Sequence, residues 1–145
     1  MKRKKVLLLD VDSRIPNLAL MRISAYHRAR GDVVSLHPSG KPDEVYVSCV
    51  FSKHRRKAEA LRQIYPDAVI GGSGWDLSVA LPSEIEAIRP DYDLYGIDYG
   101  IGYTSRGCIR RCNFCVVPHY HGASKCGEGT ALLFSMGESA NLQIV

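Results

Sequence analysis

The sequence predicts an α/β fold built around an open, mostly parallel sheet. First, the run KVLLLD at residues 5–10 is continuously apolar and ends in an acid, which is typical of a strand buried on both faces. Second, helical and strand patterns alternate from this run as far as residue 71. Third, 46% of the 145 residues are hydrophobic, which is enough for a globular core.

A helix over residues 16–30 is expected directly after the first strand. Pro16 can occupy a first helical turn. Leu18, Met21 and Ala25 then recur at steps of three and four residues, as on one face of a helix. Gly31 offers a stop at the end of this pattern.

The following segments predict two strands, over residues 32–37 and 44–51, with the turn sequence PSGKPD between them. Ser52 is suited to cap a helix over residues 53–65, whose apolar side chains fall at helical spacing. Residues 67–70 form a short strand that leads into the glycine loop 71–74. Further along, Ser83 and Glu86 have the spacing of a capping box that would begin a short helix.

We expect these segments to form a sheet with at least three parallel strands, because buried apolar runs alternate with helices. The core predicted from the apolar pattern consists of Val6, Leu7, Leu8, Leu9, Leu18, Met21, Ala25, Val33, Val45, Val47, Leu61, Val69 and Ile70.

The composition changes near residue 95, where PDYDLYGIDYG is aromatic, acidic and punctuated by glycine. We place a boundary there, between a first domain over residues 1–95 and a second segment over residues 96–145. From Tyr99 a short strand is expected to lead into a cysteine-rich loop. After Pro118 the strand and helix patterns fade.

Charge and cysteine content narrow the class of protein. Lys and Arg outnumber Asp and Glu by 19 to 15, an excess too small to indicate nucleic-acid binding. The apolar stretch in MKRKKVLLLDVDSR is too short for a signal peptide, and no stretch approaches the length of a membrane span. We therefore expect a soluble, cytoplasmic protein without a membrane partner. In that reducing compartment, an odd set of five cysteines indicates metal ligands or redox groups rather than disulfides.

Three of the five cysteines, Cys108, Cys112 and Cys115, lie in the stretch GCIRRCNFC with the spacing C-x3-C-x2-C. Gaps of this size let a loop wrap around one centre, and thiolates are the standard ligands of iron–sulfur clusters. Three ligands leave one iron of a four-iron cluster open to an exogenous molecule, which is a catalytic feature. Neighbouring Arg110 and Arg111 would favour the thiolate forms, although ordinary solvated arginines explain them equally well.

Zinc is the alternative metal for this loop. Structural zinc sites need four ligands, commonly arranged as two pairs, and only one C-x2-C pair exists here. His119, His121 or Cys126 could supply a fourth ligand. The competing hypothesis is therefore a non-catalytic module that binds zinc for structure or for a partner.

The cysteine loop resembles that of the radical S-adenosylmethionine superfamily, in which C-x3-C-x2-C follows the first strand of a partial (βα) barrel. The resemblance implies a [4Fe-4S] cluster on Cys108, Cys112 and Cys115, with S-adenosylmethionine on the fourth iron. It also implies that Phe114 packs near the adenine. Reductive cleavage of the sulfonium would then give a 5′-deoxyadenosyl radical that abstracts hydrogen from a substrate. An electron donor such as flavodoxin or ferredoxin would be a partner.

The first domain resembles the Rossmann-like, cobalamin-binding-type domain that precedes the radical barrel in one branch of the superfamily, through IPNLALMRISAYHRARGDVV and AVIGGSGWD. Many such domains ligate cobalt through a D-x-H-x-x-G motif after the first strand. Here Asp12 is followed by Ser13 and Arg14, and no histidine precedes His27, which argues against cobalamin.

The remaining candidate residues have simpler interpretations. Gly71, Gly72 and Gly74 could bring backbone amides close to a nucleotide-like ligand, or could form only a turn. Cys49 lies in an apolar run and is expected to be a buried, inert thiol. The histidines at 27 and 54 are expected to be solvated on helices. We predict no catalytic side chain from the sequence itself.

Chain length bears on activity. Only thirty residues follow Cys115, whereas each strand–helix–strand unit of a barrel takes about thirty or more. We therefore expect this chain to contain only the start of a barrel and not to complete catalytic turnover by itself.

Overall fold

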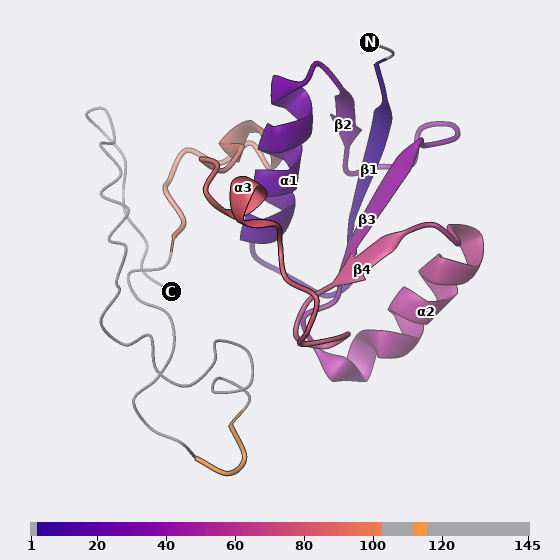
Figure 1. The fold of residues 1–145 in the computed structure, drawn as a ribbon, viewed down its shortest axis with the longest axis vertical. Helices are drawn as coiled ribbons and strands as arrows, with labels where there is room; N and C mark the ends of the chain where they lie inside the picture. The colour runs from indigo at the N-terminus through magenta and orange to yellow at the C-terminus, as the bar shows by residue number, and fades with distance from the viewer. Residues whose placement is uncertain (1–2, 103–111, 116–145) are drawn as a thin grey trace. The chain divides into compact units, whose positions relative to one another are not determined.

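The computed structural model describes residues 3–102 and 112–115, and Figure 1 shows their arrangement. The chain divides into two compact units, Met1–Gly96 and Ile97–Val145. The helices and strands of the described residues all lie in the first unit: β1 (Lys5–Asp10), α1 (Leu18–Ala29), β2 (Val33–Ser35), β3 (Glu44–Ser48), α2 (Arg55–Ile64), β4 (Val69–Gly71) and α3 (Ser83–Glu86).

A four-stranded, fully parallel sheet forms the centre of this unit, in the order β2-β1-β3-β4. Lys5 is aligned with Val33 of β2, and Leu7 is aligned with Val45 of β3. The apolar strand β1 is therefore interior, as its continuous hydrophobic run predicts. The expected α/β class and the expected set of at least three parallel strands are confirmed.

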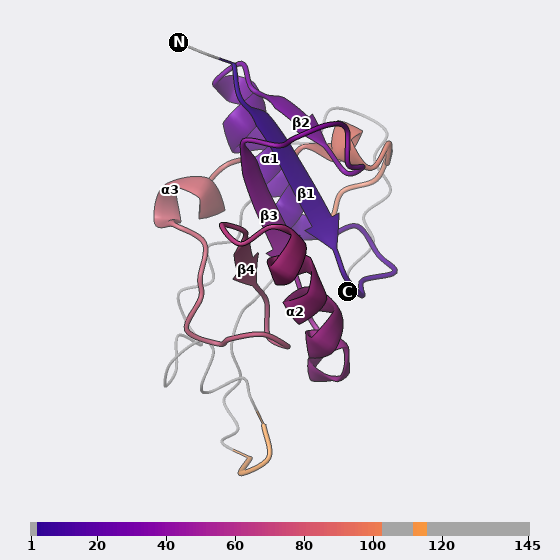
Figure 2. The same ribbon diagram turned by 90° about the vertical axis from the view of Figure 1, so that its right-hand side faces the viewer.

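Helices cover both faces of the sheet, because successive side chains of a strand point to opposite faces. Val6 and Leu8 of β1 pack with Leu20 of α1 and Ile85 of α3. Leu7 packs on the other face with residues that include Ala58 of α2. Figures 1 and 2 show α1 and α2 on opposite sides of the sheet. The result is a three-layer arrangement with two apolar clusters.

Most of the predicted core is buried, and the two most exposed exceptions lie on edge strands. The residues confirmed as buried are Val6, Leu7, Leu8, Met21, Val45, Val47 and Ile70. Leu9, Leu18, Ala25 and Leu61 are only partly buried. Val33 is 47% exposed and Val69 is 54% exposed. Both of these residues lie on short edge strands, which have a neighbour on one side only.

Several predicted element ends are wrong for reasons of local hydrogen bonding. Helix α1 begins at Leu18 because Asn17 caps it, its side-chain oxygen accepting from the amides of Ala19 and Leu20. Ser52 opens a single 3-10 turn, Ser52–His54, rather than capping α2. Pro82 occupies the N-cap position of α3 and Ser83 is its first helical residue, so Ser83 is not at the N-cap that the predicted capping box requires.

The connection from β2 to β3 contains no helix. Residues 36–43 alone return the chain to the start of a parallel strand, which is a short path for a parallel crossover. The path suffices because β2 has only three residues. Gly40, in the turn sequence identified above, adopts a φ of 71° that favours glycine.

Candidate metal centre

A tight turn joins Cys112 and Cys115. The amide of Cys115 donates to the carbonyl of Cys112 at 3.0 Å, which closes a four-residue turn over Asn113 and Phe114. Both thiols are free and half-buried. The turn therefore holds two thiol-bearing residues at its two ends, a local geometry that suits ligands of one metal centre.

The rest of the predicted ligand set falls on residues that the structure does not describe. Cys108, Arg110 and Arg111 lie outside the described residues, as do the alternative zinc ligands His119, His121 and Cys126. Within residues 3–102 and 112–115, no group of three or more His, Cys, Asp or Glu side chains is arranged to hold a metal ion. The donor chemistry of Cys112 and Cys115 fits a thiolate-ligated cluster.

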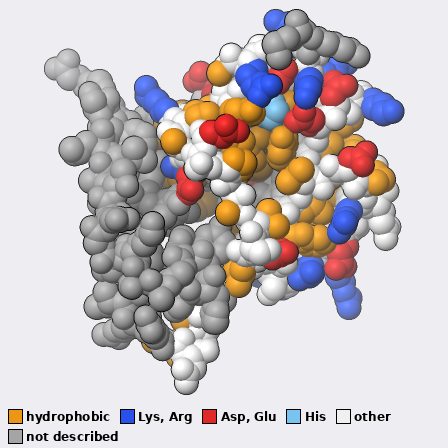
Figure 3. Space-filling view, viewed as in Figure 1, with side chains coloured by type: hydrophobic (Ala, Val, Ile, Leu, Met, Phe, Trp, Pro, Cys, Tyr) orange, Lys and Arg blue, Asp and Glu red, His pale blue; other side chains and the backbone are white. Residues whose placement is uncertain are grey.

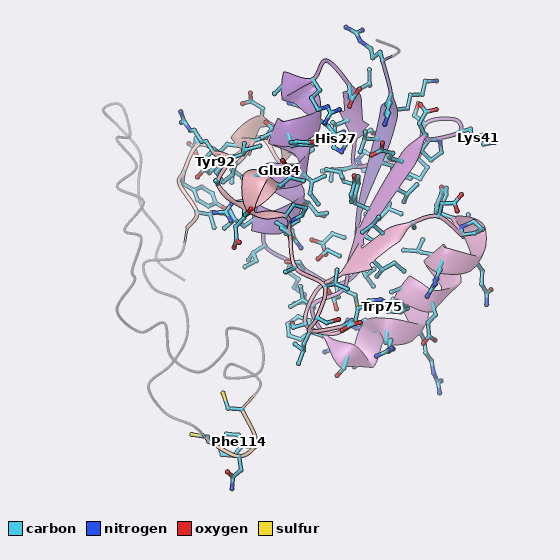
Figure 4. All side chains as sticks on the ribbon, viewed as in Figure 1. His27, Lys41, Trp75, Glu84, Tyr92 and Phe114 are labelled. Carbon is cyan, nitrogen blue, oxygen red and sulfur yellow. The ribbon has the colours of Figure 1, made fainter. Side chains whose placement is uncertain are left out.

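Phe114 lies in the same turn, and the residue is 91% exposed (Figure 4). Exposure of this degree is unusual for an aromatic ring, because burial of a phenylalanine side chain stabilises a protein by about 1.5–3 kcal/mol. The ring is available to a ligand in the described turn.

The glycine loop after β4 is packed against the segment that follows β3. Gly72 has a φ of 109°, and a Cβ atom there would lie 2.3 Å from the carbonyl oxygen of Cys49. A Cβ atom on Gly74 would lie 2.4 Å from the carbonyl carbon of Phe51. The amide of Gly74 donates to the Cys49 carbonyl at 3.0 Å. Close backbone packing accounts for Gly72 and Gly74, and a nucleotide-like ligand at this loop stays a prediction.

Asp12 lies at the carboxyl edge of the sheet, between β1 and β3. The sequence predicts no function for its carboxylate. Its side chain is fully buried. Its two oxygens accept hydrogen bonds from the amides of Val50 at 2.9 Å and Phe51 at 2.8 Å, and one lies 3.3 Å from Nδ1 of His54. In doubly wound sheets this edge is where ligands bind. In this protein the carboxylate of Asp12 already accepts the hydrogen bonds of the amides that follow β3.

We call the contacts of the Asp12 carboxylate with the amides of Val50 and Phe51 and with His54 the Asp12 latch. The pKa of Asp12 is consistent with these contacts. Burial of Asp12 favours the neutral acid, but hydrogen bonds from Val50, Phe51 and His54 outweigh burial and lower the pKa of Asp12 below its usual value. Burial, followed by the nearby charge of Asp12, raises the pKa of the Cys49 thiol. Cys49 is fully buried, so the expectation of an inert thiol is confirmed in its burial.

Comparison with protein-family models, curated proteins and solved structures gives no match. In the part of the chain that the structure describes, every helix is too short or too polar to cross a membrane.

Two histidines depart from the predicted solvated positions. His54 is only 28% exposed at its side chain, and it faces Asp12 rather than solvent alone. His27 is buried, with 5% of its side chain exposed. A single-sequence pattern does not reveal the contact of His54, because Asp12 and His54 are 42 residues apart. The one available signal was an acid two residues after the end of a buried strand, at the edge where loops of parallel strands meet.

Proposed function

We propose that this chain binds a [4Fe-4S] cluster through the thiolates of Cys108, Cys112 and Cys115, as part of a radical S-adenosylmethionine enzyme. The observation that carries most weight is the turn in which the Cys115 amide binds the Cys112 carbonyl, because it holds two of the three thiols at its ends. The spacing of Cys108 then supplies a third ligand on the same loop.

Three protein ligands would leave one iron for the amino and carboxylate groups of S-adenosylmethionine. When bound, the cluster would supply the electron that cleaves the sulfonium of this cofactor. The role of the chain is to hold the ligands and to offer the exposed ring of Phe114 to the adenine. A small one-electron donor of the flavodoxin or ferredoxin kind would reduce the cluster. Cobalamin is not part of the proposal, because no histidine follows β1 in the required position.

Metal content after anaerobic reconstitution with iron and sulfide tests this function. We expect about four irons per chain and visible charge-transfer absorbance. Replacing Cys108, Cys112 or Cys115 singly with alanine should remove most of the iron. The matched control is Cys126→Ala, a cysteine of the same segment outside the C-x3-C-x2-C spacing, which should keep the full iron content.

The competing zinc module makes the opposite prediction. Stoichiometric zinc in the isolated protein, without visible absorbance after reconstitution, would contradict the cluster and favour the zinc hypothesis. Loss of iron in the Cys126→Ala control would show instead that the ligand set has been misassigned.

A further inference from the structure

A run of cations stands at the start of α2, on the side of the helix that faces away from the sheet. The run KHRRK covers residues 53–57, and Lys53, Arg56 and Lys57 are all exposed. Their spacing of three and four residues places them on one side of a helical turn. Ala58 faces the other way and is buried in the apolar cluster on this side of the sheet. Figure 3 shows Lys and Arg side chains over α2, at the lower right.

The positive charge of the chain is matched by this one segment. Lys and Arg outnumber Asp and Glu by 19 to 15 in the whole sequence, which is an excess of four. Residues 53–57 alone contain four formal positive charges, those of Lys53, Arg55, Arg56 and Lys57. The rest of the chain holds 15 cations and 15 acids. A small overall excess therefore coexists with a strongly cationic patch.

The placement of these cations disfavours helix α2 itself. The helix dipole favours acids in a first turn, and the first turn of α2 contains none. Lys53 and Lys57 are like charges four residues apart, which repel each other. In the part of the chain that the structure describes, neither Arg56 nor Lys57 forms an ion pair. Folding does not explain the run, whereas binding of an anionic partner does.

Two aromatic rings lie among the cations. Nζ of Lys53 is 5.6 Å from the ring centroid of Phe51, a residue that is 51% exposed. The guanidinium of Arg55 lies 4.8 Å from the ring centroid of Trp75, and its Nη1 donates to the Trp75 carbonyl at 3.0 Å. Figure 4 shows Trp75 beside α2. We name the α2 surface after its helix, and its members are Phe51, Lys53, Arg55, Arg56, Lys57 and Trp75.

The acids near the α2 surface are engaged in other contacts. Asp12 is buried and accepts from backbone amides in the Asp12 latch. Oε1 of Glu59 lies 3.6 Å from Nε of Arg55. Asp76 accepts from the amide and the hydroxyl of Ser78 at 2.8 and 2.7 Å. The outer side of the helix start therefore keeps a net positive charge.

We propose that the α2 surface binds single-stranded nucleic acid. Its lysines and Arg56 would contact phosphates, and the exposed ring of Phe51 would stack on a base. The Arg55 guanidinium, held over Trp75, offers a second plane for stacking. Only unpaired bases can stack on side chains in this way, so the rings favour a single strand over a duplex.

A lipid surface fits these residues less well. Helices that lie in a membrane interface bury a broad apolar face in the lipid. The apolar face of α2 is already used, because Ala58 and Leu61 pack in the core. The proposed binding goes beyond the cluster function and does not depend on it, because every member of the α2 surface belongs to the first compact unit.

Fluorescence anisotropy of the full chain with a labelled oligouridine or oligothymidine of about 20 nucleotides tests the proposal. Three phosphate contacts predict that log Kd rises with log salt concentration with a slope of about 2. The combined variant Lys53→Glu, Arg56→Glu and Lys57→Glu should weaken binding about tenfold or more and remove this slope. Acids at a helix start are favoured by the dipole, so unfolding would not explain the loss.

The matched control reverses three exposed cations elsewhere in the same unit, Lys41→Glu, Arg62→Glu and Arg89→Glu. It changes the net charge equally, and at about 150 mM salt it should keep the affinity within about threefold. Phe51→Ala tests stacking separately, and it should weaken binding about fivefold or more with the salt slope unchanged.

Three results would overturn the proposal. The first is an equal loss of affinity in the two triple variants, which would indicate a general charge effect. The second is tighter binding to a duplex of the same length than to the single strand. The third is binding to phosphatidylglycerol vesicles without binding to either oligonucleotide, which would assign the α2 surface to a membrane instead.

Discussion

At the scale of single residues, Asp12 joins two loops that the sequence keeps far apart. Its carboxylate receives the amides of Val50 and Phe51 together with His54, and no part of its side chain is exposed. Hydrogen bonds to a charged acceptor are stronger than neutral ones, so this latch fixes the loop after β3 to the loop after β1.

We predict that Asp12→Ala lowers the free energy of unfolding by about 1–3 kcal/mol, because the donors of Val50, Phe51 and His54 lose their acceptor. Urea unfolding at neutral pH measures the loss. Asp67→Ala is the matched control, since Asp67 is an exposed aspartate of the same unit and should cost little. Equal losses in the two variants would show that the latch contributes no stability.

The same contact has a pH dependence of definite sign. The folded pKa of Asp12 lies below the ordinary value of about 3.9, so its stabilisation is fully present above that pH. It is lost as pH falls through the lower folded value. The difference in stability between the wild type and Asp12→Ala should therefore shrink under acid conditions.

At the scale of elements, the glycine loop after β4 is defined by backbone packing. Gly71 and Gly74 belong to one loop, yet their surroundings differ. A Cβ atom on Gly71 would meet only Cγ1 of Val79, at an ordinary 3.5 Å. A Cβ atom on Gly74 would lie 2.4 to 2.7 Å from backbone atoms of Phe51 and Ser52, which cannot rotate away.

We predict that Gly74→Ala destabilises the protein by about 1–3 kcal/mol or more, because the added methyl group displaces the segment after β3. Gly71→Ala is the neighbouring control and should be neutral or slightly stabilising, since alanine loses less conformational entropy in a strand. Thermal unfolding of the two variants measures the contrast. A stable Gly74→Ala variant would mean that the loop can separate from Phe51.

The sequence predicts the elements far better than their contacts. The apolar run of β1 identifies an interior strand because burial on both faces leaves a local, continuous pattern. The position of Asn17 as a helix cap depends on two hydrogen bonds that several residue types could make nearby. His27 contacts Tyr46, which is 19 residues away in the chain and reaches it only through the fold. No local periodicity encodes such contacts.

At the scale of the whole molecule, the apolar core and the cysteine turn belong to different compact units. The buried residues of the two apolar clusters all fall between Val6 and Ile85, and the partly buried residues packed on them extend to Leu94. Cys112 and Cys115 lie in the second unit, which begins at Ile97. The core of the sheet is thus complete without either thiol.

This separation leads to a prediction about cluster binding and stability. Ligand binding stabilises only the cooperative unit whose folded state forms the site. We therefore expect cluster loading to leave unfolding of the sheet unchanged within about 0.5 kcal/mol. Trp75 is the sole tryptophan of the chain and packs on the α2 face of the core, so its fluorescence follows the first unit alone. Urea titrations of reconstituted wild type and of Cys112→Ala should give the same Trp75 midpoint. A midpoint that rises with iron content would show that the two units unfold together.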